Sequence, residues 1–138
     1  MSTSDYKLDA LEAREKLDSV SPTMCLAKWN QVSLHLPTGM TNSCYHPPLH
    51  NIDPEKLVDN PAALHNTAEK MNQRSQMLKG ERPEGCSYCW KMEDTGEMSD
   101  RQYRSGEPWA MQDFDAIRQN PMDERWTPRY VEVNFNNA

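Results

Sequence analysis

Four cysteines, at positions 25, 44, 86 and 89, constrain this chain more than any other feature of its sequence. Only 36% of its 138 residues are hydrophobic, so apolar burial alone would support a core of this size weakly. The N-terminus lacks the apolar run of an export signal, and we therefore expect a cytoplasmic protein. In a reducing compartment, cysteines are more often metal ligands or reactive thiols than disulfides, so their spacing becomes the main guide.

The spacing favours one shared metal centre formed by Cys25, Cys44, Cys86 and Cys89. Two residues separate the last pair, which lets both sulfurs face one concave turn, as in a chelating knuckle. Four thiolates suit either a tetrahedral zinc ion or a [4Fe-4S] cluster. A zinc ribbon more usually has two knuckles, which gives iron–sulfur a slight preference.

Other interpretations of these cysteines stay open at this stage. Isolated buried thiols, a redox pair and disulfides all rank below a metal centre. His46 and His50 follow Cys44 closely, and either could replace a cysteine as a ligand, although a solvated loop position explains them more simply. No catalytic residue and no further cofactor-binding residue is predicted.

Composition excludes two classes of partner. The net charge is −6, and no block of Lys or Arg is long enough to follow a phosphate backbone, so nucleic acid is not expected. No stretch approaches the roughly 20 apolar residues of a membrane helix, so no membrane partner is expected either.

The first half of the chain predicts a helix followed by a hairpin. Apolar positions in residues 5–17 recur with the period of a short amphipathic helix. Residues 30–36 alternate apolar and polar side chains, which is typical of a half-buried strand. A Pro-Thr-Gly turn at 37–39 allows a return strand over 40–45, so Cys25 and Cys44 would lie at the open end of the hairpin.

The second half predicts a loop, a helix, a second loop and a strand. Proline-rich residues 45–54 indicate an irregular loop, and Asn-Pro and Lys-Gly signals bound a helix over 61–79. Residues 81–89 read as a loop carrying C-x2-C, and 127–136 as a strand. The predicted fold class is α+β: a small, irregular, metal-clasped domain with a β-hairpin, a central helix and a C-x2-C loop.

The cysteine pattern resembles a known family. Cys25, thirteen residues, Gly39, four residues and Cys44, followed by the C-x2-C pair, is similar to SPASM and twitch domains of radical S-adenosylmethionine enzymes. Cys25-x2-Lys28-Trp29 resembles their C-x2-P-W opening, with lysine in place of proline. The likeness covers about residues 24–105.

A second stretch extends the resemblance past the ligands. Cys86-x2-Cys89-x3-Glu93-x2-Gly96-x2-Ser99-x-Arg101 is similar to the family's C-x2-C-x3-E-x2-G-x2-S-x-R. Thr95 stands where SPASM domains have another cysteine, so a twitch-like domain with one cluster is the better comparison. Glu93 and Arg101 could form an ion pair that braces the segment after the knuckle, and the alternative is that Arg101 faces a substrate.

The resemblance implies an auxiliary [4Fe-4S] domain with an electron-relay or structural role beside a peptide-like substrate. Its partner would be the radical SAM core of a longer chain, which would also bind S-adenosylmethionine. The C-x3-C-x2-C motif of such a core does not occur here, and in twitch-first members it follows a strand like residues 130–137, so we expect a fragment that is inactive alone. The division expected is an N-terminal extension (1–22), a twitch-like domain (23–110), and a linker with a terminal strand (111–138). The alternative is a free-standing four-cysteine zinc module for protein interaction.

Overall fold

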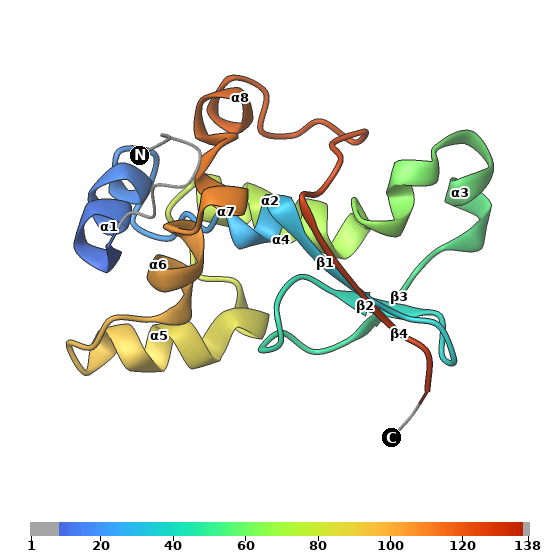
Figure 1. Ribbon diagram of the computed structural model, residues 1–138, viewed down its shortest axis with the longest axis horizontal. Coiled ribbons are helices and arrows are strands. Elements are labelled where there is room, and N and C mark those ends of the chain that lie inside the picture. The colour runs from blue at the N-terminus through green and yellow to red at the C-terminus, as the bar shows by residue number, and fades with distance from the viewer. Residues whose placement is uncertain (1–8, 137–138) are drawn as a thin grey trace.

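A four-stranded sheet and a set of short helices form the described part of the chain, residues 9–136 of a computed structural model (Figure 1). The α-helices are α1 (Ala10–Asp18), α2 (Ala27–Asn30), α3 (Pro54–Asp59), α4 (Ala68–Leu78), α5 (Ser87–Asp94), α6 (Asp100–Ser105), α7 (Pro108–Met111) and α8 (Phe114–Gln119). Two 3-10 helices are η2 (Pro61–Leu64) and η3 (Glu84–Cys86), and the strands are β1 (Gln31–His35), β2 (Met40–Asn42), β3 (His50–Asn51) and β4 (Tyr130–Asn134). The predicted α+β class is confirmed. Within residues 9–136, no helix has the length and apolar character needed to cross a membrane.

The predicted hairpin is the centre of the sheet, whose strand order is β3-β2-β1-β4. Strands β1 and β2 pair antiparallel, and Gly39 in the turn has a φ of +69°, which glycine adopts without strain. The return strand ends at Asn42 rather than at Tyr45. Two residues of the expected loop form the edge strand β3, which pairs with β2. The prolines of this loop lie outside the two residues and therefore do not interrupt their hydrogen bonds.

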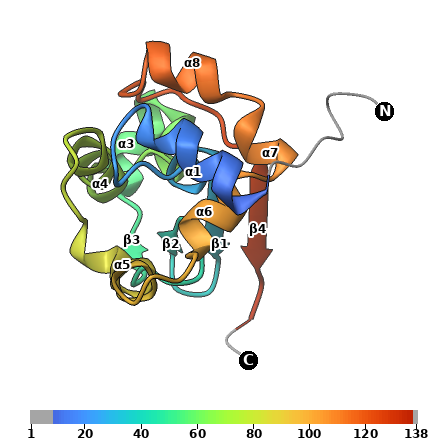
Figure 2. The same cartoon turned by 90° about the vertical axis from the view of Figure 1, so that its left-hand side faces the viewer.

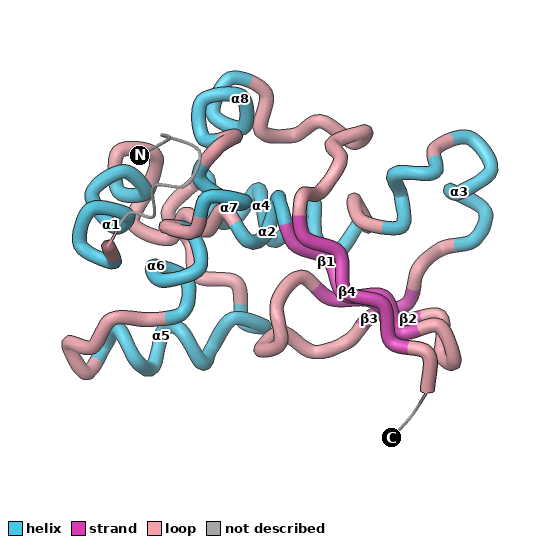
Figure 3. The backbone as a smooth tube through the Cα atoms, in the orientation of Figure 1, coloured by secondary structure: helices cyan, strands magenta, loops and turns pink. Residues whose placement is uncertain are grey.

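The predicted terminal strand is observed as β4, and it is paired. Strand β4 lies parallel to β1, in register from Gln31↔Tyr130 to His35↔Asn134. A parallel pair needs a long connection, and here residues 36–129 form it (Figure 3). The other side of β4 is an edge of the sheet as described for residues 9–136.

Strand β1 does not follow the half-buried pattern that its alternation predicts. Its first residues, Gln31, Val32 and Ser33, are all buried, whereas Leu36 just beyond its end is 56% exposed. The reason is position: β1 continues directly from the buried helix α2, so both of its faces are covered at first, and it leaves the core only at its far end.

The helix predicted over 61–79 is broken into η2 and α4. Asn60 caps η2 by accepting from the amide of Ala62, and the Thr67 side chain starts α4 by accepting from the amide of Lys70. His65, which lies between the two helices, is turned inward and buried. A second capping residue therefore divides the apolar pattern. Likewise, the predicted helix over 5–17 is observed as α1, and its residues 5–8 lie outside the described part.

One hydrophobic core joins residues from all three expected segments. Viewed from the side, α1, α6, α7 and α8 gather beyond one end of the sheet, with α4 and α5 beside them (Figure 2). The core side chains come from α1, from the stretch before β1, from α4, from the knuckle and from α7 and α8: Leu17, Met24, Cys25, Leu26, Ala27, Trp29, Met77, Cys86, Cys89, Trp90, Ala110, Phe114 and Ile117.

Asn30, at the junction of α2 and β1, ties the C-terminal part of the chain to this core. Its side chain is fully buried. Its Nδ2 donates to the Ala110 carbonyl at 3.2 Å and to Asp113 Oδ2 at 2.9 Å, and its Oδ1 accepts from Trp126 Nε1 at 2.8 Å. Its carbonyl accepts from the amide of Arg129, one residue before β4.

We expect Asn30→Ala to lower the free energy of unfolding by about 3 kcal/mol, because it leaves several buried polar groups without a hydrogen-bond partner. Urea denaturation measures the loss. Asn51→Ala is the matched control: Asn51 is exposed on β3, and its replacement should change the free energy by less than about 0.5 kcal/mol. Equal losses in the two variants would contradict the anchoring role of Asn30.

Candidate metal centre

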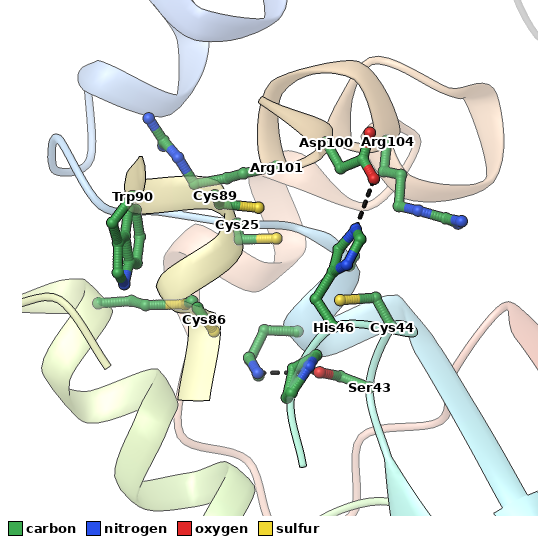
Figure 4. Close-up of a pocket in the computed structure, with 14 residues that line it drawn as sticks. Cys25, Ser43, Cys44, His46, Cys86, Cys89, Trp90, Asp100, Arg101 and Arg104 are labelled. Atoms are coloured by element: carbon green, nitrogen blue, oxygen red, sulfur yellow. Dashed lines mark hydrogen bonds and ion pairs between the residues drawn. The ribbon is translucent and has the colours of Figure 1, made fainter. Parts of the chain in front are cut away.

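All four cysteines line one pocket, although they come from three separate parts of the chain. Cys25 lies just before α2, Cys44 lies two residues after β2, and Cys86 and Cys89 lie where η3 meets α5. In Figure 4 the thiols of Cys25, Cys44 and Cys89 point toward a common space that Cys86 borders. The cavity between these side chains is small, with a volume of about 20 Å³.

The knuckle begins a helix, whereas the sequence predicted a loop. Cys86 ends η3 and Cys89 lies in the first turn of α5. Pro83 fixes this start, because its carbonyl accepts from the amide of Cys86 at 3.1 Å and from Trp90 Nε1 at 2.8 Å. Helical backbone therefore sets the separation of the two sulfurs.

The predicted ion pair between Glu93 and Arg101 is confirmed. Arg101 Nε and one terminal nitrogen donate to the two carboxylate oxygens at 2.9 and 2.8 Å, and Ser99 Oγ adds a bond of 2.6 Å. The Arg101 side chain is only 3% exposed and that of Glu93 14%. Burial raises the pKa of Glu93, but the hydrogen bonds from Arg101 and Ser99 lower it more, so the pKa lies below the ordinary value.

The same arginine contacts the segments that carry two of the cysteines. Its remaining terminal nitrogen donates to the carbonyl of Met24, next to Cys25, at 2.6 Å. Its backbone amide hydrogen-bonds to the Cys89 thiol and lowers the pKa of that thiol. Arg101 is therefore a brace that holds Cys25 and Cys89 in the same wall of the pocket (Figure 4).

Burial, and after it the neighbouring cysteines, favour the protonated form of three of the thiols. Burial and then Cys44 raise the pKa of Cys25 to about 11, against the opposing effect of Lys28. Burial and then Cys25 raise the pKa of Cys89 to about 12. The four groups thus lie within electrostatic range of one another, and a bound metal would replace the protons.

Lys28 brings a positive charge to the pocket wall. Its Nζ donates to Ser43 Oγ and to Gln73 Oε1, both at 2.8 Å. Burial raises the pKa of Cys86, and Lys28 lowers it through its charge and a hydrogen bond. The sequence presented Lys28 only as a departure from a family proline, although its position one helical turn after Cys25 places both residues on one face.

Of the two histidines considered as alternative ligands, His46 lines the pocket and His50 does not. The ring of His46 stacks on Tyr88 with centroids 4.0 Å apart, and its Nε2 lies 2.6 Å from Asp100 Oδ2. His50 instead contacts Thr67, away from the cysteines. His46 therefore belongs to the rim of the pocket, held by partners of its own.

The four thiols that line the pocket are donors of the kind that soft metals prefer. Among residues 9–136, no three His, Cys, Asp or Glu side chains are arranged to hold a single ion. The four thiols instead surround a space, and soft sulfur donors select zinc, copper(I) or iron–sulfur. Comparison of the chain with protein-family models, with curated proteins and with solved structures gives no match.

We expect Arg101→Met to lower the free energy of unfolding by about 3 to 5 kcal/mol, because it leaves a buried carboxylate and the Met24 carbonyl without their partner. Arg82→Met is the matched control, since Arg82 forms a bidentate pair with Asp94 at 2.8 and 2.9 Å on the surface. Its loss should leave the stability nearly unchanged. Urea denaturation of both variants compares the pairs, and an equally mild effect at Arg101 would show that it does not brace the pocket.

The Glu93 carboxylate also predicts a pH dependence. Because its folded-state pKa is lowered, its contribution to stability is present above the ordinary value of about 4.5 and is lost as the pH falls through the lowered value. Between pH 7 and pH 3, Glu93→Gln should lose less stability than the unaltered chain. Exposed Glu97→Gln is the control and should follow the unaltered chain. Parallel curves for all three proteins would remove Glu93 as a source of acid sensitivity.

Proposed function

We propose that the pocket holds one [4Fe-4S] cluster, ligated by Cys25, Cys44, Cys86 and Cys89. The observation that carries the proposal is the convergence of four cysteines from three segments on a single, largely buried pocket. Unrelated buried cysteines would have no reason to face one space. The agreement of their spacing with the SPASM and twitch pattern supports the same assignment.

The cysteine spacing favours a cluster over a single zinc ion. A zinc ribbon more usually has two C-x2-C knuckles, whereas this chain has one knuckle and two single cysteines. A tetrahedral zinc ion would take the same four sulfurs, each at about 2.3 Å from one point. A zinc-binding interaction module is therefore the outcome that would replace this proposal.

The function that fits this site is electron relay or structural support. A [4Fe-4S] cluster with four thiolate ligands has no open iron for a substrate, and it exchanges single electrons when bound. Trp90 and the surrounding core limit the access of water, while Arg101 holds two of the ligand segments. Cys44 is the least buried of the four, which places one side of the centre near the surface for an electron partner.

We further propose that the domain serves a radical SAM core, beside a peptide-like substrate. The support for this step is the resemblance alone, from Cys25 to Arg101. The C-x3-C-x2-C motif for S-adenosylmethionine is not part of this sequence, so the four cysteines would bind the auxiliary cluster only.

Anaerobic reconstitution with iron and sulfide tests the cluster. We expect a brown protein with about four irons and four sulfides per chain and charge-transfer absorption in the visible. Cys86→Ala should lose most of this absorption, because a ligand is missing, whereas Ser87→Ala, at the exposed neighbouring position, should retain it. Stoichiometric zinc without iron after growth in iron-replete medium would favour the zinc module instead.

A further inference from the structure

Three cationic side chains lie inside the protein near the cysteine pocket. Lys28, Lys70 and Arg74 are 2%, 0% and 0% exposed. Within residues 9–136, none of the three has a carboxylate at ion-pair distance, in contrast to Arg101. Buried charges are normally paired, because removing an ion from water is costly. Arg74 has the Asp123 carboxylate within electrostatic range, so it is Lys28 and Lys70, which have no paired carboxylate, that call for an explanation.

The hydrogen bonds of Lys70 and Arg74 show a structural role but no neutralisation. Lys70 Nζ donates to the Gln31 carbonyl at 3.1 Å and to His65 Nδ1 at 2.8 Å. Arg74 donates to the Lys28 carbonyl and to Asn66 Oδ1. His65 is neutral, because burial and the two cations lower its pKa well below the ordinary value. Burial, Arg74 and Lys28 likewise lower the pKa of Lys70, and negative charge on Cys44 raises it.

Lys28 is the member of this group that reaches the pocket. It lines the pocket wall, and its ammonium is held by Ser43 and Gln73, which are both neutral. The other buried pocket cation, Arg101, is already neutralised by Glu93. Lys28 therefore presents an ammonium without a carboxylate partner to the pocket, where it hydrogen-bonds to the Cys86 thiol.

We propose that Lys28 is the counter-charge of the metal–thiolate centre and raises its reduction potential. This inference rests on the proposed function, since it concerns the cluster that the four cysteines would hold. A centre with four thiolates is negatively charged, and it supplies the anion that the buried cations lack.

The direction of the effect follows from electrostatics. One-electron reduction adds a negative charge to the cluster without forming or breaking a bond. A fixed ammonium in the low-dielectric wall stabilises the reduced form more than the oxidised form, so the potential rises. Because Lys28 is buried, salt screens this interaction only slightly.

A potentiometric titration of the reconstituted protein, followed by electron paramagnetic resonance, tests the proposal. In Lys28→Met the equilibrium constant for reduction should fall at least tenfold, which is a downward shift of about 59 mV or more for one electron. Lys28→Arg retains the charge and should stay near the unaltered value. Lys91→Met, at an exposed lysine on α5, is the matched control and should not shift the potential.

The stability of the metal-free protein gives a second, independent readout. Without the cluster, Lys28 is a buried cation with no carboxylate partner, so metal-free Lys28→Met should have an unchanged or higher midpoint of urea denaturation. If metal-free Lys28→Met fails to fold, or if loaded Lys28→Met has an unchanged potential, the proposed role of Lys28 is wrong, whereas the cluster proposal stands. If the unaltered chain takes up no cluster, the proposed function fails and this inference fails with it.

Discussion

The segment from Thr23 to Ser33 is buried without interruption, and the rest of the structure depends on how its polar backbone is satisfied. Only four of its residues form a helix, so many of its amide and carbonyl groups need partners from elsewhere. Side chains from distant elements provide them, in the pairs Arg101 with Met24, Ser105 with Leu26, Arg74 with Lys28, His65 with Trp29, and Lys70 with Gln31. Long cationic side chains thus fill part of the core, in a chain whose composition has few large apolar residues.

The same segment carries Cys25 and Lys28, so assembly of the core and assembly of the pocket are one process. The arginine whose side chain satisfies the Met24 carbonyl, next to Cys25, also donates its backbone amide to the Cys89 thiol. The use of cationic side chains in the core is electrostatically unfavourable, because several cations and few anions become buried. Four thiols in the middle of such an environment can become the missing negative charge once a metal replaces their protons.

The sequence predicted what local patterns and ligand chemistry determine. The hairpin follows from alternation and a Pro-Thr-Gly turn, and the shared pocket follows from the cysteine spacing. The sequence did not predict features that depend on distant partners. Thr67 divides the expected long helix because His65 before it is drawn into the core, and the parallel pairing of Val131 with Val32 joins segments about a hundred residues apart. No local pattern marks Lys28 as buried, since the partners of its ammonium, Ser43 and Gln73, are distant in the sequence.

The two buried cations of the pocket wall have different roles: one holds the cysteine segments in place, and the other acts on the cysteines through its charge. Arg101 meets Glu93 in a bidentate pair, so much of its charge is offset locally and its main contribution to the site is geometric. Lys28 is held by the neutral oxygens of Ser43 and Gln73 and hydrogen-bonds to the Cys86 thiol, and it has no carboxylate partner among the described residues. Both cations act on Cys25, but the charge of Arg101 is shared with Glu93, whereas the charge of Lys28 faces the cysteines unpaired.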